Sequence, residues 1–465
     1  MTERIPLHDA TTRVSLYAKR EPIHVRAVKG RFQRLRRGLD WLLLALYAGL
    51  PWLTWDGRQA VWFDIPARQF HIFATTFYPQ DATLLAWLLI LGAFGLFLVT
   101  VIAGRVWCGY ACPQSVWTWL FIWVEQRLEG SRHRRIRQAA GPPDAAVRAR
   151  KLAKHVIWLL IALATGVSFV GYFTPIRELV ADLATLSAGG WALFWTGFFT
   201  LFTYLNAGWL REQVCLYMCP YARFQSVMFD KDTLIVSYDA ARGEPRTAGR
   251  RRASTADTTP GDCIDCRRCV QVCPTGIDIR DGLQYACLGC AACIDACDDV
   301  MDQLGRPRGL VRYTTEHALE GRPTRWLRPR LIGYLAALLA MVALLAWQLA
   351  ERVPLDADLE RDRHQLYDVT AEGGIRNAYT LRVRNMDARA HRYRLTLRGI
   401  DGLRLSDTQR LTLAPGAGRS LALSIIAPAE SLDAPSQAFI LAITAIDAPR
   451  IHLAKEARFL GPARR

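Results

Sequence analysis

The sequence predicts a multidomain membrane protein, in which an α-helical transmembrane bundle of five spans carries an inserted α+β domain rich in cysteine and is followed by a C-terminal all-β sandwich. Three observations predict this fold class. The 465 residues, enough for about three domains, gather much of their apolar content into five long runs. All twelve cysteines stand in three clusters of fixed spacing. The last part of the chain alternates between apolar and polar residues, as strands do.

The five apolar runs are each close to the roughly 20 residues that a helix needs to cross a bilayer. A buried core helix can imitate the first or the third run, but it cannot easily imitate the second or the fifth. From the N-terminus, the runs are residues 39–55, 82–104, 156–173, 189–210 and 331–349.

Basic residues alternate between the loops in a way that sets the orientation of the spans. Ten Lys and Arg precede residue 39, nine lie in 125–155 and eighteen in 211–330, whereas 56–81 hold two and 174–188 hold one. Because Lys and Arg favour the cytoplasmic side of a membrane, we expect the N-terminus and the cysteine-rich insert in the cytoplasm. Five spans then place the C-terminal domain in the periplasm, and the expected location is the bacterial inner membrane.

The net charge of +17 is also typical of nucleic-acid-binding proteins. Here much of the charge lies in the loops that topology predicts to be basic, so we expect no nucleic-acid partner. The RHRRIRQ run at residues 132–138 predicts an anchor at the inner membrane face, near anionic lipid.

The strongest signal in the chain is the cysteine spacing of CIDCRRCVQVCP, residues 263–274, which is C-x2-C-x2-C-x3-C-P. A second quartet, CLGCAACIDAC, follows at residues 287–297. This is the spacing of bacterial two-cluster ferredoxins, in which the fourth thiolate of each quartet binds the other cluster. The sequence therefore predicts two [4Fe–4S] clusters, one held by Cys263, Cys266, Cys269 and Cys297 and the other by Cys287, Cys290, Cys293 and Cys273.

Other uses of these eight cysteines fit less well. A zinc module would have two C-x2-C pairs rather than two quartets. Disulfides do not suit the cytoplasm, where thiols stay reduced. The chain contains no C-x-x-C-H, so no covalently attached c-type haem is indicated. Asp298 stands where a proline often follows the second quartet, and this removes no ligand.

The remaining four cysteines form two matched pairs, in CGYACP at residues 108–113 and CLYMCP at residues 215–220. Residues four apart share one face of a helix, and the proline that follows each pair tends to end or kink that helix. Each motif is followed by QSV, which indicates a weak internal duplication of two-span hairpins. Packed together, the hairpins would bring Cys108, Cys112, Cys215 and Cys219 to one place at the cytoplasmic membrane surface.

The chemistry of these four thiols stays open at this point. Soft thiolates select Cu(I), zinc or iron–sulfur clusters, and a dithiol can itself be redox-active. Buried thiols also behave as small hydrophobic groups, so a purely structural pair of helix ends is the alternative. Met218 either adds a soft ligand or only packs.

The C-terminal segment carries the all-β prediction. AYTLRVRN (residues 378–385) and HRYRLTLRG (residues 391–399) alternate with period two around a turn, which is typical of a β-sandwich. His364, His391 and His452 are scattered, and we expect each at the surface. The domain is either a docking module or a stabilising cap.

These elements set the predicted domain boundaries. A polar, basic stretch rich in Pro, Gly and Thr at residues 241–262 predicts a tether. The predicted order is a basic cytoplasmic segment (1–38), a four-span membrane domain with both C-x3-C-P motifs (39–229), a linker (230–262), the two-cluster ferredoxin domain (263–300), a connector (301–330), the fifth transmembrane helix (331–350) and the periplasmic sandwich (351–465).

Paired C-x3-C-P motifs, a two-cluster ferredoxin insert, one more span and an outer domain together resemble the cytochrome c oxidase accessory proteins of the CcoG, FixG and RdxA type. The resemblance covers nearly the full length, including the loop at residues 61–81. The cysteine motifs alone also resemble the membrane polyferredoxins of nitrate and nitrous oxide reductase systems, but the C-terminal domain favours the first family.

The resemblance implies an immunoglobulin-like periplasmic domain and a cupric reductase that converts Cu(II) to Cu(I) for the copper centre of C-family haem–copper oxidases. The proposed copper site of that family corresponds here to Cys108, Cys112, Cys215 and Cys219. Implied partners are a copper transporter or chaperone and oxidase assembly factors. The electron donor is unknown, either cytoplasmic or a quinol, and the oligomeric state is open, a homodimer included.

Two other functions compete with copper reduction. One is a quinol-linked electron conduit to a periplasmic reductase, which the absence of cysteine from residues 351–465 disfavours. The other is a non-enzymatic scaffold for oxidase assembly, whose clusters sense oxygen or iron.

Overall fold

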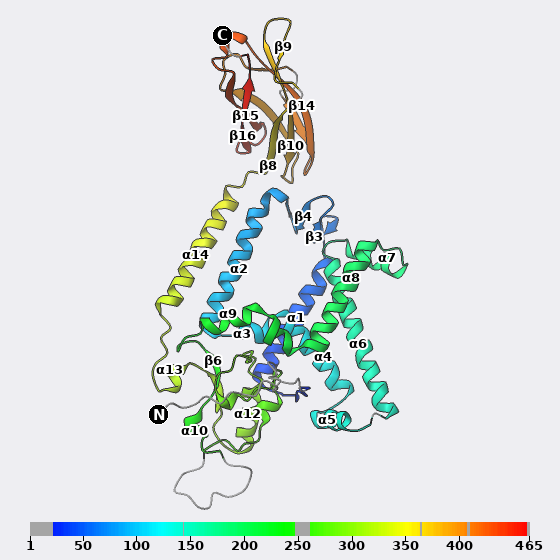
Figure 1. The fold of residues 1–465 in the computed structure, drawn as a ribbon, viewed down its shortest axis with the longest axis vertical. Coiled ribbons are helices and arrows are strands. Elements are labelled where there is room, and N and C mark those ends of the chain that lie inside the picture. Colours follow the sequence, from blue (N-terminus) through cyan, green and yellow to red (C-terminus); the bar gives the residue numbers. More distant parts are fainter. Residues whose placement is uncertain (1–21, 143, 247–260, 363–364, 407–409, 463–465) are drawn as a thin grey trace, which may run out of the picture. The chain divides into compact units, whose positions relative to one another are not determined.

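The computed structural model describes residues 22–142, 144–246, 261–362, 365–406 and 410–462 (Figure 1). Its contacts divide the chain into two compact units. The first unit comprises residues 1–44, 99–165 and 198–327, and the second comprises residues 45–98, 166–197 and 328–465. All twelve cysteines belong to the first unit. Three predicted features fall partly or wholly on residues that the structure does not describe, namely the start of the basic N-terminal segment, most of the tether and His364.

Three helices are long and apolar enough to cross a membrane among the residues that the structure describes. They correspond to the second, third and fifth predicted runs and comprise Pro79–Ala103, Ala145–Val170 and Pro329–Ala350. The first predicted run falls on α1 (Arg31–Gly49), which carries four arginines and an aspartate. The fourth falls on α8 (Gly190–Thr203), which has 14 residues and continues as the π-helix η3 (Tyr204–Leu210). A span count of five therefore stays a prediction.

One part of the first unit is built around the two C-x3-C-P motifs. The first motif forms the short helix α3 (Val106–Tyr110), and Pro113 begins α4 (Pro113–Leu128). The second motif forms the π-helix η4 (Val214–Met218), and Pro220 begins α9 (Pro220–Met228). Proline suits the first position of a helix because that position needs no N–H donor. Each proline therefore separates two helices, as the sequence predicts.

Large aromatic side chains pack the helices of this region together. Phe121 of α4 stacks on Trp158 of α6 (Ala145–Val170) at 5.2 Å between ring centroids. The Trp158 indole N–H donates to the Phe121 carbonyl over 3.0 Å. Val124, Ala162 and Ala207 complete this buried cluster. Helix α4, which follows the first motif, is thus packed against α6 and η3.

The cysteine-rich insert extends beyond the predicted residues 263–300. Strand β6 (Ile235–Tyr238) pairs antiparallel with β7 (Val311–Thr314), and these strands lie in the predicted linker and connector. Helices α11 (Arg268–Gln271) and α12 (Ala292–Gln303) complete the main elements. One buried cluster joins Val236, Tyr238 and Val311 with cysteines of both quartets. The strands are part of the insert because their buried faces complete its core.

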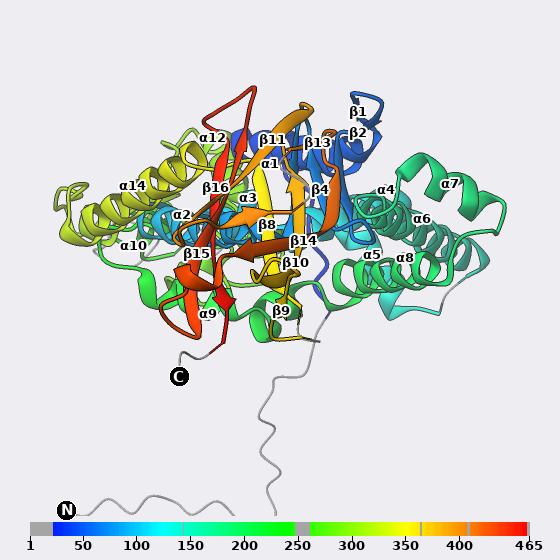
Figure 2. The same ribbon diagram turned by 90° about the horizontal axis from the view of Figure 1, so that it is seen from above.

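The second unit contains a β-sandwich of two antiparallel sheets (Figure 1 and Figure 2). One sheet has the order β12-β14-β10-β8, with β9 paired to β10, and the other has the order β13-β11-β15-β16. The two predicted strands appear as β10 (Ile375–Asn385) and β11 (His391–Arg398). The other strands are β8 (Leu355–Arg361), β9 (Asp368–Val369), β12 (Arg404–Leu405), β13 (Arg410–Leu413), β14 (Gly418–Ala427), β15 (Ser436–Ala445) and β16 (His452–Leu460).

Alternate side chains of these strands form the sandwich core, in which Tyr379, Tyr393, Phe439 and Phe459 are the largest fully buried residues. His391 differs from its predicted surface position. It is buried, and its two ring nitrogens each lie 2.8 Å from a carboxylate, of Asp387 and of Asp447. His452 is exposed, as predicted.

The loop at residues 61–81 folds into a small sheet of β3 (Val61–Asp64), β4 (Gln69–Ile72) and β5 (Thr75–Phe77). Its end meets the base of the sandwich within the second unit. Arg352 donates to both carboxylate oxygens of Asp81, at 2.9 and 2.6 Å. The guanidinium of Arg384 lies over the ring of the buried Tyr78.

Candidate iron–sulfur and thiol site

The structure brings the predicted ligands of the first cluster to one cavity. Cys263, Cys266, Cys269 and Cys297 line it together with Tyr238, Met301 and Leu310. Burial raises the pKa of the Cys269 thiol to about 12, and it raises the pKa of Cys297 to the same range. Buried thiols resist ionisation unless a cation compensates the thiolate charge. A cavity with four cysteine thiols, lined also by Arg267, Arg268 and Arg280, fits an iron–sulfur cluster, whose irons compensate the thiolate charges.

The predicted ligands of the second cluster line a second cavity. Cys273, Cys287, Cys290 and Cys293 surround it with apolar neighbours such as Ile277 and Ile279. Burial raises the pKa of Cys287 to about 12 and that of Cys293 well above its ordinary value. The Gly289 N–H donates to the Cys287 sulfur over 3.4 Å. Backbone donors of this type stabilise the charge that cluster sulfurs carry.

Both cavities are shaped by the same backbone pattern. Between its first and second cysteines each quartet has a left-handed residue, Asp265 (φ 49°) and Gly289 (φ 64°). Between the second and third cysteines each has another, Arg267 (φ 53°) and Ala291 (φ 57°). This conformation costs roughly 1–2 kcal/mol for a residue other than glycine, and such strain concentrates at functional sites. The left-handed backbone positions turn the first three thiols of each quartet toward a common centre.

The four C-x3-C-P cysteines also lie together. Burial raises the pKa of the Cys108 thiol to about 12, and the thiols of the other three motif cysteines add to the rise. The same holds for Cys215, whose pKa is raised to about 12 by burial and by its neighbours Cys112 and Cys219. These mutual interactions place the two thiol pairs side by side in the first unit.

The repeated QSV segments explain how the pairs are joined. Gln225, which follows the second motif, is fully buried and accepts a hydrogen bond from the Cys108 thiol over 3.3 Å. Gln114, which follows the first motif, donates to the carbonyls of Asn206 and Arg211, just before the second motif. The glutamine of each QSV segment therefore forms hydrogen bonds with the other C-x3-C-P motif or with the residues just before it.

No three His, Cys, Asp or Glu side chains among the described residues converge on the position of a single metal ion. For more than two of the C-x3-C-P thiols to reach one ion, the two pairs would have to move closer together.

Comparisons with known proteins agree with these cavities. Residues 210–316 match the family described as a 4Fe-4S dicluster domain, and residues 85–128 match a 4Fe-4S binding domain. Residues 345–462 match the Ig-like fold at the C-terminal of FixG. The nitrogen fixation protein FixG of Rhizobium meliloti (strain 1021) is 38% identical over 90% of this chain and 86% of its own length. The chain belongs to the FixG family.

Other members of the FixG family are similar over much of their length. Protein RdxA of Cereibacter sphaeroides is 42% identical over 84% of this chain and 85% of its own length, and RdxB of the same species is 43% identical. A crystal structure of a FixG-related protein from Vibrio parahaemolyticus covers 23% of this chain and 95% of its own, at 25% identity and a TM-score of 0.22. The chain is thus an iron–sulfur protein of the electron-transfer type, associated with membranes.

In this FixG-family chain, the C-x3-C-P site and the ferredoxin site are in direct contact, which the sequence does not indicate. A β-carbon on Gly109, inside the first C-x3-C-P motif, would lie 2.8 Å from the Cα of Cys290. One on Gly289 would lie 3.2 Å from the carbonyl carbon of Arg105. Helix α3 therefore packs backbone to backbone on the loop that carries Cys287 and Cys290. In the sequence, the only sign of this contact is one glycine in the first C-x3-C-P motif and another in the second ferredoxin quartet.

Arg105 stabilises the contact between α3 and the ferredoxin loop. Its guanidinium donates to the carbonyls of Tyr285 and Ala222 and lies 4.9 Å from the centre of the Tyr285 ring. The side chain is buried. Arg105 thus ties the segment before the first motif to α9, which follows the second motif, and to the ferredoxin loop.

Proposed function

We propose that this chain is a membrane iron–sulfur oxidoreductase that reduces Cu(II) to Cu(I) at Cys108, Cys112, Cys215 and Cys219. The observation that supports the proposal most is the packing of α3 on the loop of Cys287 and Cys290, which brings the four thiols next to a predicted cluster site. Soft thiolates favour Cu(I) over Cu(II), so the thiol site stabilises the reduced product.

The residues proposed to hold the two [4Fe–4S] clusters are the eight ferredoxin cysteines in the two sets that line the two cavities. When bound, the clusters supply one-electron carriers. The chain's own residues exclude water from the cavities and fix the distance between the cavities and the thiols. The reaction at the thiol site is the gain of one electron by one Cu(II) ion, and no general acid or base is needed.

The proposal extends to location and partners. The chain would cross the bacterial inner membrane five times, with the ferredoxin insert in the cytoplasm and the Ig-like domain in the periplasm. Copper released as Cu(I) would pass to a chaperone or transporter and serve the assembly of a haem–copper oxidase. The thiol site lies on the cytoplasmic side of this arrangement because basic loops flank both motifs.

The first test is Cu(II) reduction by anaerobically purified, pre-reduced protein, with Cu(I) trapped by a colorimetric chelator. The quadruple Cys→Ser variant of the C-x3-C-P cysteines is expected to lose the activity while its iron content stays intact. The two double variants, C108S/C112S and C215S/C219S, are each expected to lose it as well, since the thiols share one site. Phe224→Leu, at an exposed residue of α9 after the second motif, is the matched control and should be active.

Equal copper reduction by the wild type and the quadruple variant would contradict the proposal. The electrons would then come directly from the ferredoxin cavities, and the scaffold function would be favoured. Activity in one double variant but not the other would show that the pairs act separately.

A further inference from the structure

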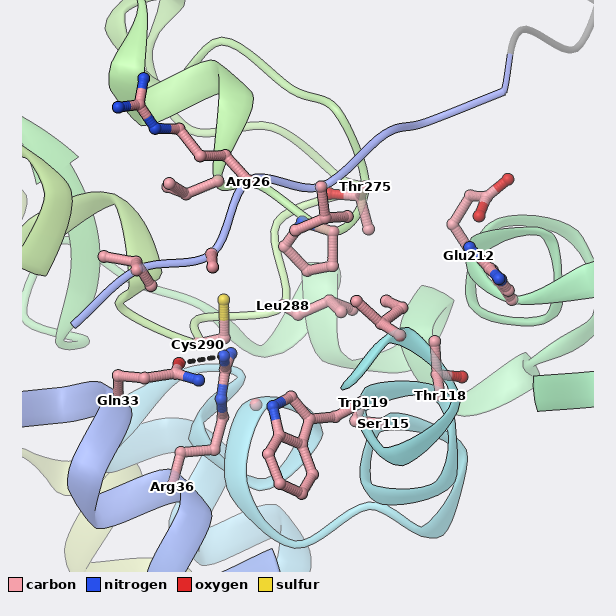
Figure 3. Close-up of a pocket in the computed structure, with 18 of the residues that line it drawn as sticks. Arg26, Gln33, Arg36, Ser115, Thr118, Trp119, Glu212, Thr275, Leu288 and Cys290 are labelled. Atoms are coloured by element: carbon pink, nitrogen blue, oxygen red, sulfur yellow. Dashed lines mark hydrogen bonds between the residues drawn. The ribbon is translucent and has the colours of Figure 1, made fainter. Parts of the chain in front are cut away.

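A pocket in the first unit has a cysteine of each motif type in its wall. Cys215 of the second C-x3-C-P motif and Cys290 of the ferredoxin insert both line it. Figure 3 shows Gln33 and Arg36 reaching into this space from α1 and Trp119 from α4, with Leu288 and Cys290 on the ferredoxin side. A molecule bound here would therefore lie beside both redox-active sites.

Three polar atoms of the pocket lack partners for hydrogen bonding, although other atoms of the lining are paired, such as the Arg36 amino group that donates to Gln33. Nε of Arg36, Nε of Arg37 and the hydroxyl of Ser115 are buried and have no partner among the described residues, and all three residues line the pocket. All three atoms can donate a hydrogen bond. Because a buried donor without a partner costs about 1–3 kcal/mol, the pocket calls for a ligand with acceptor oxygens.

The charge of the pocket disfavours a bare metal cation as that ligand. Four arginines line it, against the single carboxylate of Glu212. Arg211 pairs with Glu125, whose carboxylate lies 2.7 Å away and is shared with Arg135, and Arg26 donates to Gln271. Arg36 and Arg37 carry the unpartnered Nε–H groups, so we take them as the cationic pair that faces the ligand. This pair disfavours a metal cation on the α1 side of the pocket, whereas Cys215, on the opposite wall, belongs to the thiol site.

The remaining wall is largely apolar. Trp119, Ile122 and Leu288 contribute to it. The Trp119 ring is fixed in place by the Arg37 guanidinium at 5.8 Å and by Trp41, edge-on at 6.2 Å. An apolar and aromatic lining with a few placed donors suits an apolar ring that carries oxygens.

Helix α1 connects this pocket to an apolar surface. Beyond Arg36 and Arg37, the side chains of Trp41, Leu42 and Leu46 on α1 are exposed. This part of α1 is the first predicted membrane run. A ligand dissolved in the membrane can reach the pocket along such a helix, whereas a water-soluble anion gains nothing from it.

We propose that the pocket is the electron-donor site of the chain and that it binds a membrane quinol. The hydrogen-bond donors of Arg36, Arg37 and Ser115 hold the ring oxygens, and Trp119 packs on the ring. The proposal rests on the proposed function for the acceptor. The balanced reaction is one quinol plus two Cu(II) giving one quinone, two Cu(I) and two protons, which pass to cytoplasmic water.

The binding test uses the full-length protein in detergent and a photoreactive azidoquinone, with labelled peptides located by mass spectrometry. We expect label on α1 or α4 at the pocket, and protection by excess unlabelled quinone. The double variant R36Q/S115A should bind at least tenfold more weakly. Arg34→Gln, on the exposed face of the same helix, is the matched control and should bind as the wild type does.

Iron content and the visible absorption of the purified variants show whether they are folded. Should R36Q/S115A fail to fold, the single variant Ser115→Ala provides the same comparison with a smaller expected loss. Label elsewhere, or label that these variants leave unchanged, would overturn the proposal. Protection by anionic phospholipid but not by quinone would also overturn it, because the pocket would then be a lipid headgroup site.

A second measurement separates this inference from the proposed function. With dithionite as the electron donor, R36Q/S115A should reduce Cu(II) as fast as the wild type, whereas with a quinol donor its rate should fall at least tenfold. Loss of copper reduction by the wild type with dithionite would refute the proposed function and leave quinone binding as a separate result.

Discussion

Gly109 is the residue at which the C-x3-C-P site and the ferredoxin insert meet. Because a methyl group there would lie 2.8 Å from the Cα of Cys290, one of the two backbones must shift to accommodate it. The contact joins two residues that are 181 positions apart in the chain. Nothing local in the sequence marks it, and this is why the sequence predicts candidate ligands but not the contact that positions them.

Gly109→Ala is expected to destabilise the first unit by about 1–3 kcal/mol, the usual cost of overpacking a well-packed contact. It should also alter the EPR spectrum of the cluster bound near Cys290, while the other cluster is unaffected. Gly38→Ala is the control, since a β-carbon on Gly38 of α1 would meet nothing within 4 Å. Identical spectra and stability for the two variants would show that the contact is not tight.

His391 illustrates a different limit at the residue scale. Its position at the start of a strand is readable from the sequence, but its two carboxylate partners are not. Asp447 comes from a loop 56 residues away. Burial lowers the pKa of His391, but the hydrogen bonds to Asp387 and Asp447 outweigh burial, so the net pKa lies above its ordinary value of 6.5.

This raised pKa makes the stability of the sandwich depend on pH. A group whose pKa is higher in the folded state stabilises the fold fully below its unfolded pKa, and the contribution disappears as pH rises through the folded pKa. His391→Gln should therefore cost about 1–3 kcal/mol at pH 6 and distinctly less at pH 9, given the usual strength of charged hydrogen bonds. Hydrogen exchange of β11 in the full-length protein measures this, and an equal loss at both pH values would contradict it.

At the scale of elements, predictions succeeded where the signal is local. The prolines at 113 and 220 each begin a helix, and the alternating segments became β10 and β11. The pairing of β6 with β7 escaped prediction because each strand has four residues and its partner is more than 70 residues away. The eight ferredoxin cysteines fall into the two expected cavities because their spacing alone dictates the loops.

The link between the small sheet of residues 61–81 and the sandwich is another non-local contact. Asp81 and Arg352 form a bidentate, largely buried ion pair. Removing one partner of such a pair leaves the other charge buried, at a cost of about 3–5 kcal/mol when burial is complete.

Asp81→Asn and Arg352→Met are each expected to increase proteolysis at the base of the sandwich. In the double variant, the increase in proteolysis should be smaller than the sum of the increases in the two single variants. Arg382→Met, which removes an exposed pair with Glu360, is the control and should change little. Strict additivity of the two single variants would show that the pair is not coupled.

For the whole molecule, family membership and the Ig-like domain are shown by comparison, whereas the number of spans is not. Apolar length alone identifies three helices among the described residues. Helices α1 and α8 escape that criterion because one is charged at its start and the other changes to a π-helix. The alternation of basic loops remains the argument for five.

Fusions to reporter enzymes would measure this topology. Alkaline phosphatase joined after residue 462 should be active and a fluorescent protein there should be dark, because an odd number of spans separates the two ends. Phosphatase joined within residues 174–188 should also be active, and phosphatase within residues 125–155 inactive. Activity at both internal positions would contradict the five-span arrangement.

The two ferredoxin quartets share one backbone pattern but occupy different surroundings, and this has an evolutionary consequence. A duplicated half-domain begins with equal freedom at both copies. Here the left-handed position between the first two cysteines holds Asp265 in one half, where its carboxylate pairs with the buried Arg280. In the other half it holds Gly289, where a β-carbon would press against the backbone of Arg105. One copy accepts a side chain that forms an ion pair, while the copy that packs beside the first C-x3-C-P motif accepts only glycine without strain.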